Sequence, residues 1–399
     1  MRRFFMRVFQ RVSAIVLYFL PWREPVVYKG AGMLNMVPVA LKTADINRVV
    51  VVTDQGIKNS GLLDKVIEQL DESSISYDIY DQVEPNPDEA TIQEIADMYK
   101  KNDGQGLIGV GGGSVIDATK VAAILVNNPG KQPRDFEGLL KVRRKTAYNL
   151  MIPTTAGTGS EVTLAAVVSN PSERRKYTIM EPKIIPNAAI LAPEMLVSLP
   201  AKLTAETGMD ALTHAVESFI SRTRTKQTKH DGVKAVKLIS DYLKRSYDAP
   251  DDVAARLGML EASYYAGRAF TRAYVGNIHA MSHALTAFYD SPHGRTNALV
   301  MPIVLRMYGE PVHKALAELA DEVSLTNVDA TNEEKATAFI EWIEGLNETF
   351  GIPKHIPDIK HDDLDALIAH AYKEANPMYP VPVIFSREDF REGYLRVKR

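Results

Sequence analysis

The sequence predicts an α/β domain built on a mostly parallel sheet, followed by an all-α domain. The 399 residues exceed what one hydrophobic core usually serves, so two domains are expected. From about residue 48, short β-branched runs alternate with helical patterns, which is typical of βαβ units. Beyond a proline-punctuated stretch that begins near residue 182, helical periodicity dominates to about residue 375.

The elements of the α/β domain are predicted one after another along the chain. Each strand is a short apolar run, and each helix has apolar residues at three- and four-residue spacing. We expect strands at 48–54, 75–83, 106–113 and 149–155, and helices at 62–70, 87–101 and 114–126. The α/β domain is placed at residues 25–190 and the helical domain at 191–399.

The composition narrows the classes of function. The chain has no cysteine, which excludes disulfide scaffolds, thiolate metal sites and thiol nucleophiles. Any metal must therefore be bound by His, Asp or Glu, a ligand set that suits zinc, iron and manganese about equally. The net charge is −3 and there is no polybasic footprint for nucleic acid, so a small-molecule partner is expected.

Residues 1–24 form a basic and then apolar extension. It resembles a signal peptide, but its apolar run 14–20 is too short to span a bilayer and no A-x-A-like cleavage signal follows. We therefore place the protein in the cytoplasm. The extension is expected to form a docking helix, with contact to a membrane surface as the alternative. The residues at helical spacing are Phe4, Phe5, Val8, Phe9, Val12, Ile15 and Val16.

Three glycines, Gly111–Gly113, end the predicted strand 106–113. Ser114 is expected to cap the next helix, with Asp117 completing a capping box. Glycines at a helix N-terminus let a phosphate approach unpaired N–H groups. However, Ile116 stands where the dinucleotide fingerprint has its third glycine, and the P-loop lysine is missing. Taken alone, this run is equally consistent with a tight turn.

A second polar loop, residues 153–161, also follows a predicted strand. Two such loops at the carboxyl ends of parallel strands favour a diphosphate ligand, because α/β sheets bind ligands there. Asp54, at the end of the strand 48–54, can accept hydrogen bonds from ribose hydroxyls and would repel a 2'-phosphate. This favours NAD over NADP, with an exposed turn aspartate as the alternative.

Histidines concentrate in the predicted helical domain. Asp210 and His214 are four residues apart, His279 and His283 repeat that spacing, and His293 follows a Ser-Pro turn. Because residues four apart share a helix face, two facing helices and a loop can bring these side chains to one divalent cation. Each pair alone would more often be a surface hydrogen bond. Beside a dinucleotide, such a cation indicates hydride transfer to or from an alcohol carbon.

Four motifs follow one another in order: GGGSVIDATK, PTTAGTGSEVT, TGMDALTHAVESF and HAMSHALTAFYDSPHG. With them the chain resembles the iron-containing (group III) alcohol dehydrogenases from about residue 25 to the end. The resemblance implies a Rossmann-like, NAD-binding domain and a helical, metal-binding catalytic domain. It implies NAD(P)-linked interconversion of an alcohol with an aldehyde or ketone in the cleft between them, with Fe²⁺ or Zn²⁺ as the metal. We also expect a homo-oligomer.

The resemblance also assigns roles to individual residues. It implies that Asp210, His214, His279 and His293 are the metal ligands. It implies that His283 is a catalytic proton relay beside the substrate and that Phe270 narrows the substrate pocket. The residues matched to cofactor contacts are Asp54, Asn86, Gly112, Gly113, Ser114, Asp117, Thr154, Thr155, Thr158 and Lys176.

Departures from the family pattern leave the substrate and some alternatives open. Ala192 stands where the family commonly has Asp before a proline, and 284–286 reads Ala-Leu-Thr where Pro-Leu-Gly is common. One alternative is a dehydroquinate-synthase-like or glycerol-dehydrogenase-like enzyme of the same superfamily. The synthase type needs several cations for a substrate phosphate, and only Arg268 and Arg272 lie between the ligand helices. The other alternative is a catalytically silent scaffold, which gives no reason to keep four ligand positions together.

Overall fold

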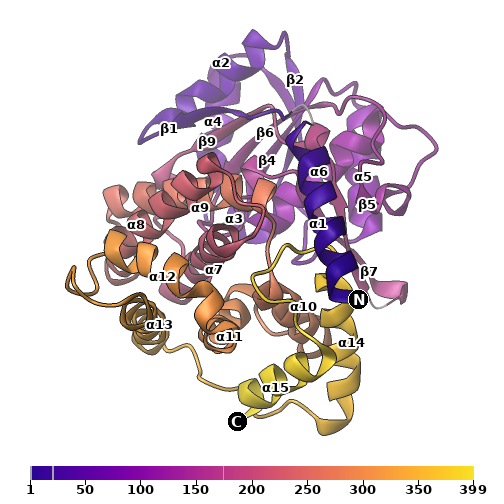
Figure 1. Cartoon of the computed structure of the whole chain (residues 1–399). Helices are drawn as coiled ribbons and strands as arrows, with labels where there is room; N and C mark the ends of the chain where they lie inside the picture. Colours follow the sequence, from indigo (N-terminus) through magenta and orange to yellow (C-terminus); the bar gives the residue numbers. More distant parts are fainter. Residues whose placement is uncertain (1, 20–21, 174) are drawn as a thin grey trace. The chain divides into compact units, whose positions relative to one another are not determined.

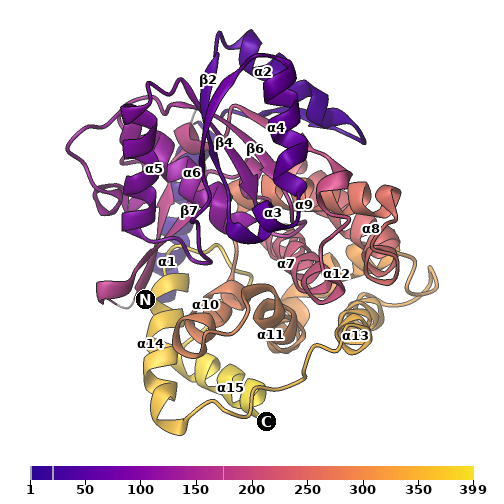
Figure 2. The same ribbon diagram turned by 180° about the vertical axis from the view of Figure 1, so that it is seen from behind.

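The structure is a computed structural model that describes residues 2–19, 22–173 and 175–399. The chain divides into two compact units. An α/β unit comprises most of residues 21–200 together with 248–264, and a helical unit comprises the N-terminal helix with 201–247 and 265–399 (Figures 1 and 2). The predicted fold class, a parallel α/β domain followed by a helical domain, is confirmed. The predicted domain boundaries stay predictions.

The described part of the α/β unit contains a six-stranded sheet in which every pairing is parallel. Its order is β1-β9-β6-β4-β2-β3. The central strands are buried along their length, because helices cover both faces of a parallel sheet. The bounds are β1 Val26–Lys29, β2 Arg48–Val52, β3 Ser76–Tyr80, β4 Gly106–Gly111, β6 Tyr148–Pro153 and β9 Ala188–Leu191.

Helices connect these strands as the sequence pattern predicts. Asp88 caps α5 by accepting a hydrogen bond from Thr91 N, which explains why that helix begins after a Pro-Asp pair. The helix after β4 is buried on nearly all sides and packs on β4, β6 and α5, so its sequence is apolar almost throughout. The bounds are α2 Met36–Thr43, α3 Gln55–Asn59, α4 Leu62–Glu72, α5 Glu89–Lys101 and α6 Gly113–Val126.

The sequence analysis did not identify β1, β9 or a second, smaller sheet. β9 lies inside the stretch predicted to be irregular from residue 182, and it is short, alanine-rich and bounded by prolines. Alanine has low strand propensity, so only pairing with β6 and β1 defines this strand. The small sheet has the order β5-β8-β7, with β5 Gly138–Leu139, β7 Ala165–Asn170 and β8 Arg175–Met180.

The helical unit is built from pairs of packed helices. Within it, α7 packs against α11, α10 packs against α11 and α14, and α12 packs against α13. The bounds are α7 Ala201–Ile220, α8 Lys226–Asp248, α9 Val253–Ala273, α10 Asn277–Tyr289, α11 His293–Tyr308, α12 Glu310–Glu322, α13 Asn332–Thr349, α14 Leu364–Ala375 and α15 Arg387–Lys398. The first part of α9 belongs to the α/β unit.

The N-terminal extension forms a helix, α1 Arg2–Tyr18, that docks on the C-terminal segment of the helical unit. Arg7 donates hydrogen bonds to the carbonyls of Val381 and Pro382, and Gln10 donates to those of Pro377 and Tyr379. The docked face therefore binds through polar side chains around one buried apolar residue, Met6. The seven apolar residues expected to dock are all exposed, so that part of the prediction was wrong. No described helix is long and apolar enough to cross a membrane.

Candidate metal site and nucleotide loops

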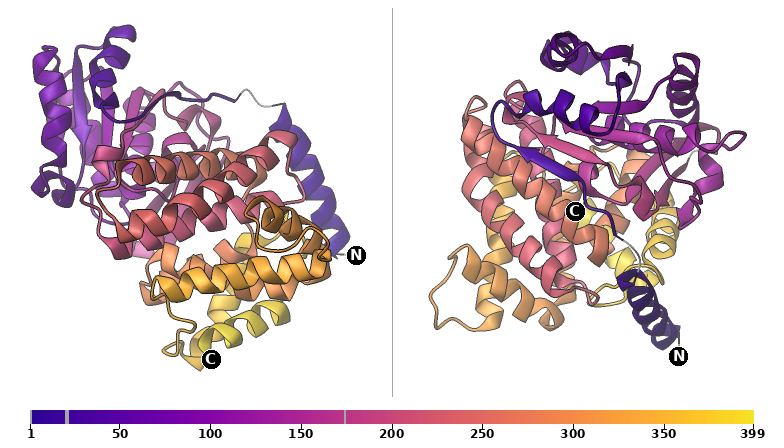
Figure 3. Two further views of the ribbon diagram at one scale, coloured as in Figure 1. Left: turned by 90° about the vertical axis from the view of Figure 1, so that its left-hand side faces the viewer. Right: turned by 90° about the horizontal axis from the view of Figure 1, so that it is seen from above.

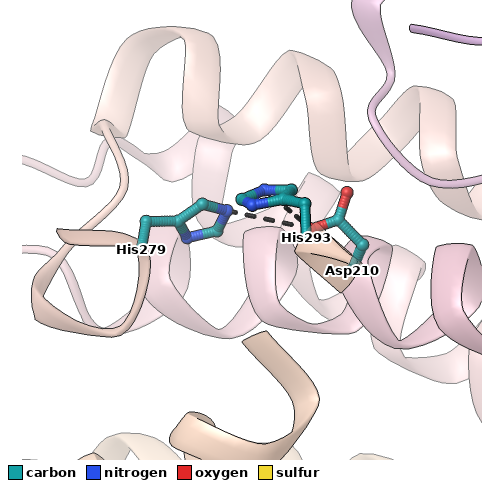
Figure 4. A group of neighbouring side chains, drawn as sticks. All are labelled: Asp210, His279 and His293. Atoms are coloured by element: carbon teal, nitrogen blue, oxygen red, sulfur yellow. Dashed lines mark ion pairs between the residues drawn. The ribbon is translucent and has the colours of Figure 1, made fainter. Parts of the chain in front are cut away.

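Asp210, His279 and His293 form a group whose potential ligand atoms all lie within 4.8 Å of one another (Figure 4). Asp210 Oδ1 is 3.4 Å from His293 Nε2 and 3.9 Å from His279 Nε2. Asp210 and His279 are buried, and His293 is partly exposed. Burial and the neighbouring His214, His293 and His283 hold the pKa of His279 well below 6.5, so its ring is neutral, as metal ligation requires.

The packing of α11 on α7 brings His293 to Asp210. A Cβ atom on Gly294 would lie 2.2 Å from the carbonyl oxygen of Glu206 and 3.2 Å from Asp210 Cβ. Only glycine allows this approach of the two helices, because a contact of 2.2 Å cannot be relieved by moving a flexible side chain. The residue after the ligand histidine therefore sets the distance between the ligand helices.

Glu217 holds the ring of His279 in place. Its Oε2 atom lies 2.6 Å from His279 Nδ1, and its carboxylate accepts hydrogen bonds from the N–H groups of Gly276 and Ile278. This one side chain therefore accepts hydrogen bonds from backbone N–H groups at the start of α10 and directs Nε2 of His279 toward Asp210. Burial raises the pKa of Glu217 to about 7 despite these hydrogen bonds.

Asn297, one turn after His293, points its amide at the same place. Nδ2 lies 2.8 Å from Asp210 Oδ1, 3.0 Å from His293 Nε2 and 3.2 Å from His279 Nε2. Asn297 Oδ1 is buried and has no hydrogen-bond partner among the described residues. Three hydrogen-bond acceptors, each with a lone pair that could bind a cation, thus converge on one amide donor. Rotating the amide would turn Oδ1 toward the same point. A cation bound among these atoms would favour that orientation, because the oxygen can face a positive charge and the N–H group cannot.

His214 and Phe270 lie next to this group. The ring of His214 stacks on His279 with centroids 4.5 Å apart, and its Nδ1 is 3.9 Å from Asp210 Oδ2. Phe270 stacks on the other side of His214 at 4.3 Å. The structure therefore groups three of the four predicted ligands and places the fourth beside them. The roles of His214 as a ligand and of Phe270 in the substrate pocket stay predictions.

His283 is oriented by a different carboxylate. Its Nδ1 lies 2.6 Å from Glu374 Oε1, which also accepts a hydrogen bond from the Tyr379 hydroxyl at 2.9 Å. The ring stacks on His293 with centroids 5.0 Å apart, and its side chain is 36% exposed. His283 therefore lies beside the candidate metal group, with one ring nitrogen held by Glu374, and its predicted catalytic role stays a prediction.

The donor set fits a divalent transition metal. One carboxylate oxygen and two imidazole nitrogens suit Fe²⁺ or Zn²⁺ and leave coordination positions for a substrate oxygen. A carboxylate behind a ligand histidine is the usual arrangement at such sites, because it fixes the tautomer and the ring orientation. The pair formed by Glu217 and His279 has that arrangement.

In the α/β unit, the loop after β4 differs from the prediction at the helix start. Gly112 is the N-cap of α6 and no side chain caps this helix, so the expected Ser114–Asp117 capping box was wrong. A Cβ atom on Gly113 would lie 2.8 Å from Thr158 Cγ2, and one on Gly112 would lie 3.4 Å from Thr155. The glycines thus allow the two loops to touch and leave backbone N–H groups at the start of α6 without a side-chain cap.

Asp117 connects the two loops from inside the protein. It accepts hydrogen bonds from the Ser160 hydroxyl and from Val167 N. One turn later, the buried Lys120 donates to the Ser160 carbonyl at 2.9 Å and to the Thr163 hydroxyl at 3.1 Å. These contacts attach α6 to the loop after β6. Burial lowers the pKa of Lys120 to about 8 against the attraction of Asp117.

Three predicted cofactor residues are brought together at the edge of this loop. Lys176 Nζ donates to Asn86 Oδ1 at 2.8 Å, and Asn86 N donates to the Ser114 hydroxyl at 3.2 Å.

Asp54 lies in the loop after β2 and caps α3 by accepting a hydrogen bond from Ile57 N at 2.9 Å. Thr154 follows β6 and donates its N–H to the Gly111 carbonyl. The strands that precede Asp54, Gly112 and Thr154 are neighbours in the parallel sheet, so these residues lie at one edge.

Comparisons with known proteins identify the family. Residues 25–193 match "iron-containing alcohol dehydrogenase" and residues 204–395 match the "Fe-containing alcohol dehydrogenase family, C-terminal" region. The chain belongs to the iron-containing alcohol dehydrogenases. These are oxidoreductases that use NAD(H) and a divalent metal, and Asp210, His279 and His293 form the candidate metal site of this member.

The similarity to individual members of the family extends over most of the chain. Alcohol dehydrogenase 4 of Schizosaccharomyces pombe is 36% identical over 88% of this chain and 83% of its own length. The NAD-dependent methanol dehydrogenase of Bacillus methanolicus is 31% identical over 90% of this chain and 93% of its own. The structure of a 1,3-propanediol oxidoreductase superposes with a TM-score of 0.91 at 29% identity, covering 95% of this chain and all of that one.

Sequence reasoning missed Glu217, Gly294, Asn297 and Glu374. Two of them had a visible signal: Glu217 is seven residues after Asp210, and Asn297 is four after His293, so each shares a helix face with a ligand. Glu374 is far from His283 in the chain and gave no such signal. Arg268, considered as a phosphate-binding cation, is instead bonded through two nitrogens to the buried Asp231, which weakens the synthase alternative.

Proposed function

We propose that this protein is an NAD-preferring, metal-dependent alcohol dehydrogenase that interconverts an alcohol with an aldehyde or ketone. The observation that supports this most directly is the convergence of Asp210, His279 and His293 in a chain of this family. Catalysis requires that the nicotinamide bound by the α/β unit reach the carbon of a substrate held at the metal site of the helical unit.

The proposed metal ligands are Asp210, His279 and His293, with His214 as the fourth. When bound, Fe²⁺ or Zn²⁺ acts as a Lewis acid that acidifies an alcohol hydroxyl or polarises a carbonyl. Glu217 keeps His279 in the tautomer that presents Nε2 to the ligand group. Phe270 is proposed to limit the size of the substrate from its place against His214.

We propose His283 as the group that moves the substrate proton. Its Nδ1 is held by Glu374, so Nε2 faces away from that carboxylate and can take up or release a proton. Glu374 is in turn fixed by the Tyr379 hydroxyl. The partly exposed ring of His283 can exchange its proton with water, which suits a relay between a closed site and solvent.

The α/β unit is proposed to bind NAD through its two loops. Gly112 and Gly113 leave backbone N–H groups at the start of α6 for the diphosphate, and Ser114, Asn86 and Lys176 form a polar edge beside them. Thr154, Thr155 and Thr158 are proposed as contacts from the second loop, while Asp117 positions that loop through Ser160. The printed name of the Bacillus methanolicus relative supports NAD.

Asp54 allows a specific test of the cofactor preference. Because Asp54 caps α3, Asp54→Ser keeps a capping hydroxyl and removes only the charge that would repel a 2'-phosphate. We expect the ratio of kcat/KM with NADP to kcat/KM with NAD to rise about tenfold or more, corresponding to about 1.4 kcal/mol. An unchanged ratio with intact folding would refute the role of Asp54.

The main experiment measures metal content and NADH formation in the same sample. A panel of short primary alcohols and diols is offered with NAD to native, chelator-treated and reconstituted protein. We expect NADH to accumulate, to disappear after chelation and to return with Fe²⁺ or Zn²⁺. Full activity in metal-free protein would exclude the proposed site, and turnover without NADH accumulation would favour the dehydroquinate-synthase-like alternative. Light scattering and fractionation would test the proposed homo-oligomer and the proposed cytoplasmic location.

A further inference from the structure

The helix α1 carries an apolar face that the rest of the described chain leaves exposed. Phe4, Phe5 and Ile15 are 68%, 63% and 59% exposed, and Val12 and Val16 are 54% and 50% exposed. At about 100° per residue, the seven exposed apolar residues Phe4, Phe5, Val8, Phe9, Val12, Ile15 and Val16 fall within an arc of about 140°. This is one continuous stripe rather than a set of scattered hydrophobic residues.

The orientation of this stripe is fixed by the opposite face of the helix. Met6 is buried against Val381 and Ile384, and Arg7 and Gln10 bond to backbone carbonyls of the same C-terminal segment. A helix held by its polar face must direct its apolar face outward. Figure 3 shows α1 as a separate rod at the margin of the helical unit.

The charge of α1 has one sign. The helix contains four arginines and no acidic residue. Arg3 and Arg11 are both exposed, and 66% of the Arg3 side chain is accessible. Arg3 lies 3.7 Å from the carboxylate of Asp389. By helical periodicity Arg11 lies about 20° beyond the Phe4 edge of the apolar arc. An apolar stripe bordered by an arginine, on a helix without acidic residues, is typical of helices that lie in the interface of an anionic bilayer.

We propose that α1 attaches this protein to the surface of an anionic membrane, with its apolar face inserted between headgroups and Arg11 among the lipid phosphates. A second copy of the chain fits less well, because α1 has no acidic residue that could pair with Arg11 of the other copy when two such faces meet. A helix of 17 residues is about 25 Å long, which suits an interfacial position, and no described helix can cross the bilayer.

The test uses full-length protein and sedimentation with lipid vesicles. Wild-type protein is expected to sediment with vesicles that contain phosphatidylglycerol, less with pure phosphatidylcholine, and less as salt increases. Phe5→Ser combined with Phe9→Ser should reduce binding at least tenfold, since each phenylalanine loses apolar burial. Arg11→Gln should reduce binding to anionic vesicles about fivefold.

Matched controls separate this surface from general effects of substitution. Val328→Ser combined with Val253→Ser removes two other exposed valines, and Arg143→Gln removes an exposed arginine of the α/β unit; both should bind as wild type does. NADH formation without vesicles should be unchanged in all variants. Vesicle binding therefore tests the membrane proposal, and NADH formation tests the proposed function independently of it. Wild-type protein that stays in the supernatant, or that forms a dimer which the double phenylalanine variant disrupts, would overturn it.

Discussion

Two histidines on one helix make the same contact in different surroundings. His279 and His283 are four residues apart on α10, and each has Nδ1 2.6 Å from a glutamate oxygen. His279 and its glutamate, Glu217, are both buried, and Nε2 of His279 faces Asp210. Around His283 the side chain is about one-third exposed and its glutamate is shared with Tyr379. The histidine–glutamate contact is therefore the same at both positions, and the two histidines differ in burial and in the neighbours of their glutamates.

The two glutamates differ in the direction of their pKa shifts. Burial raises the pKa of Glu217 to about 7, although three hydrogen bonds act against it. Burial also acts to raise the pKa of Glu374, but His283, Tyr379 and His370 outweigh it, so the net shift is downward. Glu374 therefore stays a carboxylate beside His283 at neutral pH, which suits a group that must hold a ring during proton transfer.

Removing each ring gives the largest contrast. His279→Ala should lose the bound metal and about a thousandfold or more of kcat/KM, because the substrate oxygen loses its Lewis acid. His283→Ala should retain the metal and lose about a hundredfold of kcat, because only proton transfer is impaired. Elemental analysis and steady-state kinetics of both proteins check this. Loss of metal from His283→Ala would show that His283 is a ligand.

The sequence was enough to predict the side chains that face a ligand, and not those that hold them. The four-residue spacing of Asp210 with His214 and of His279 with His283 indicated a cation site, and the family resemblance then selected Asp210, His279 and His293 among its ligands. Glu374 could not be selected, because its contact with His283 joins positions 91 residues apart and depends on how α14 packs on α10. Packing also decides which face of α1 docks, and there periodicity alone led to the wrong face.

The same limit applies in the α/β unit. The glycines at 111–113 and the strand before them could be predicted, because a phosphate-binding loop consists of a strand followed by glycines at a helix start. Ser114 was misjudged as a cap because helix starts differ by one or two residues when glycine permits either choice. The short strand β9 was missed because its alanines become a strand only by pairing on both sides.

The opposite pKa shifts predict opposite pH dependences of stability in metal-free protein. For Glu217, whose pKa is raised, the folded state binds the proton more tightly; its contribution is full below pH 4.5 and lost as pH rises to about 7. Relative to Glu217→Gln, wild type should lose on the order of 3 kcal/mol of unfolding free energy across that range. Chemical denaturation at a series of pH values measures the difference.

Glu374→Gln is the internal comparison for that experiment. Because the pKa of Glu374 is lowered, its contribution is present above pH 4.5 and lost as pH falls through the folded value. The difference between wild type and Glu374→Gln should therefore decrease as the pH falls below about 4.5, where the contribution of Glu217 is already constant. Parallel curves for the two variants would show that the two glutamates have the same environment.

The smallest effects should come from neutralising the two carboxylates, and they sharpen the comparison most. Glu217→Gln keeps the shape but can present an amide N–H to His279 Nδ1, so metal affinity should fall about 10- to 100-fold while kcat of the metal-saturated enzyme changes little. Glu374→Gln should leave metal affinity unchanged and lower kcat about tenfold, because His283 loses its fixed orientation. Metal titration and saturation kinetics separate the two outcomes. If both variants lost metal equally, His283 would have to be counted with the ligands, and the division of α10 into a ligand histidine and a proton-transfer histidine would be wrong.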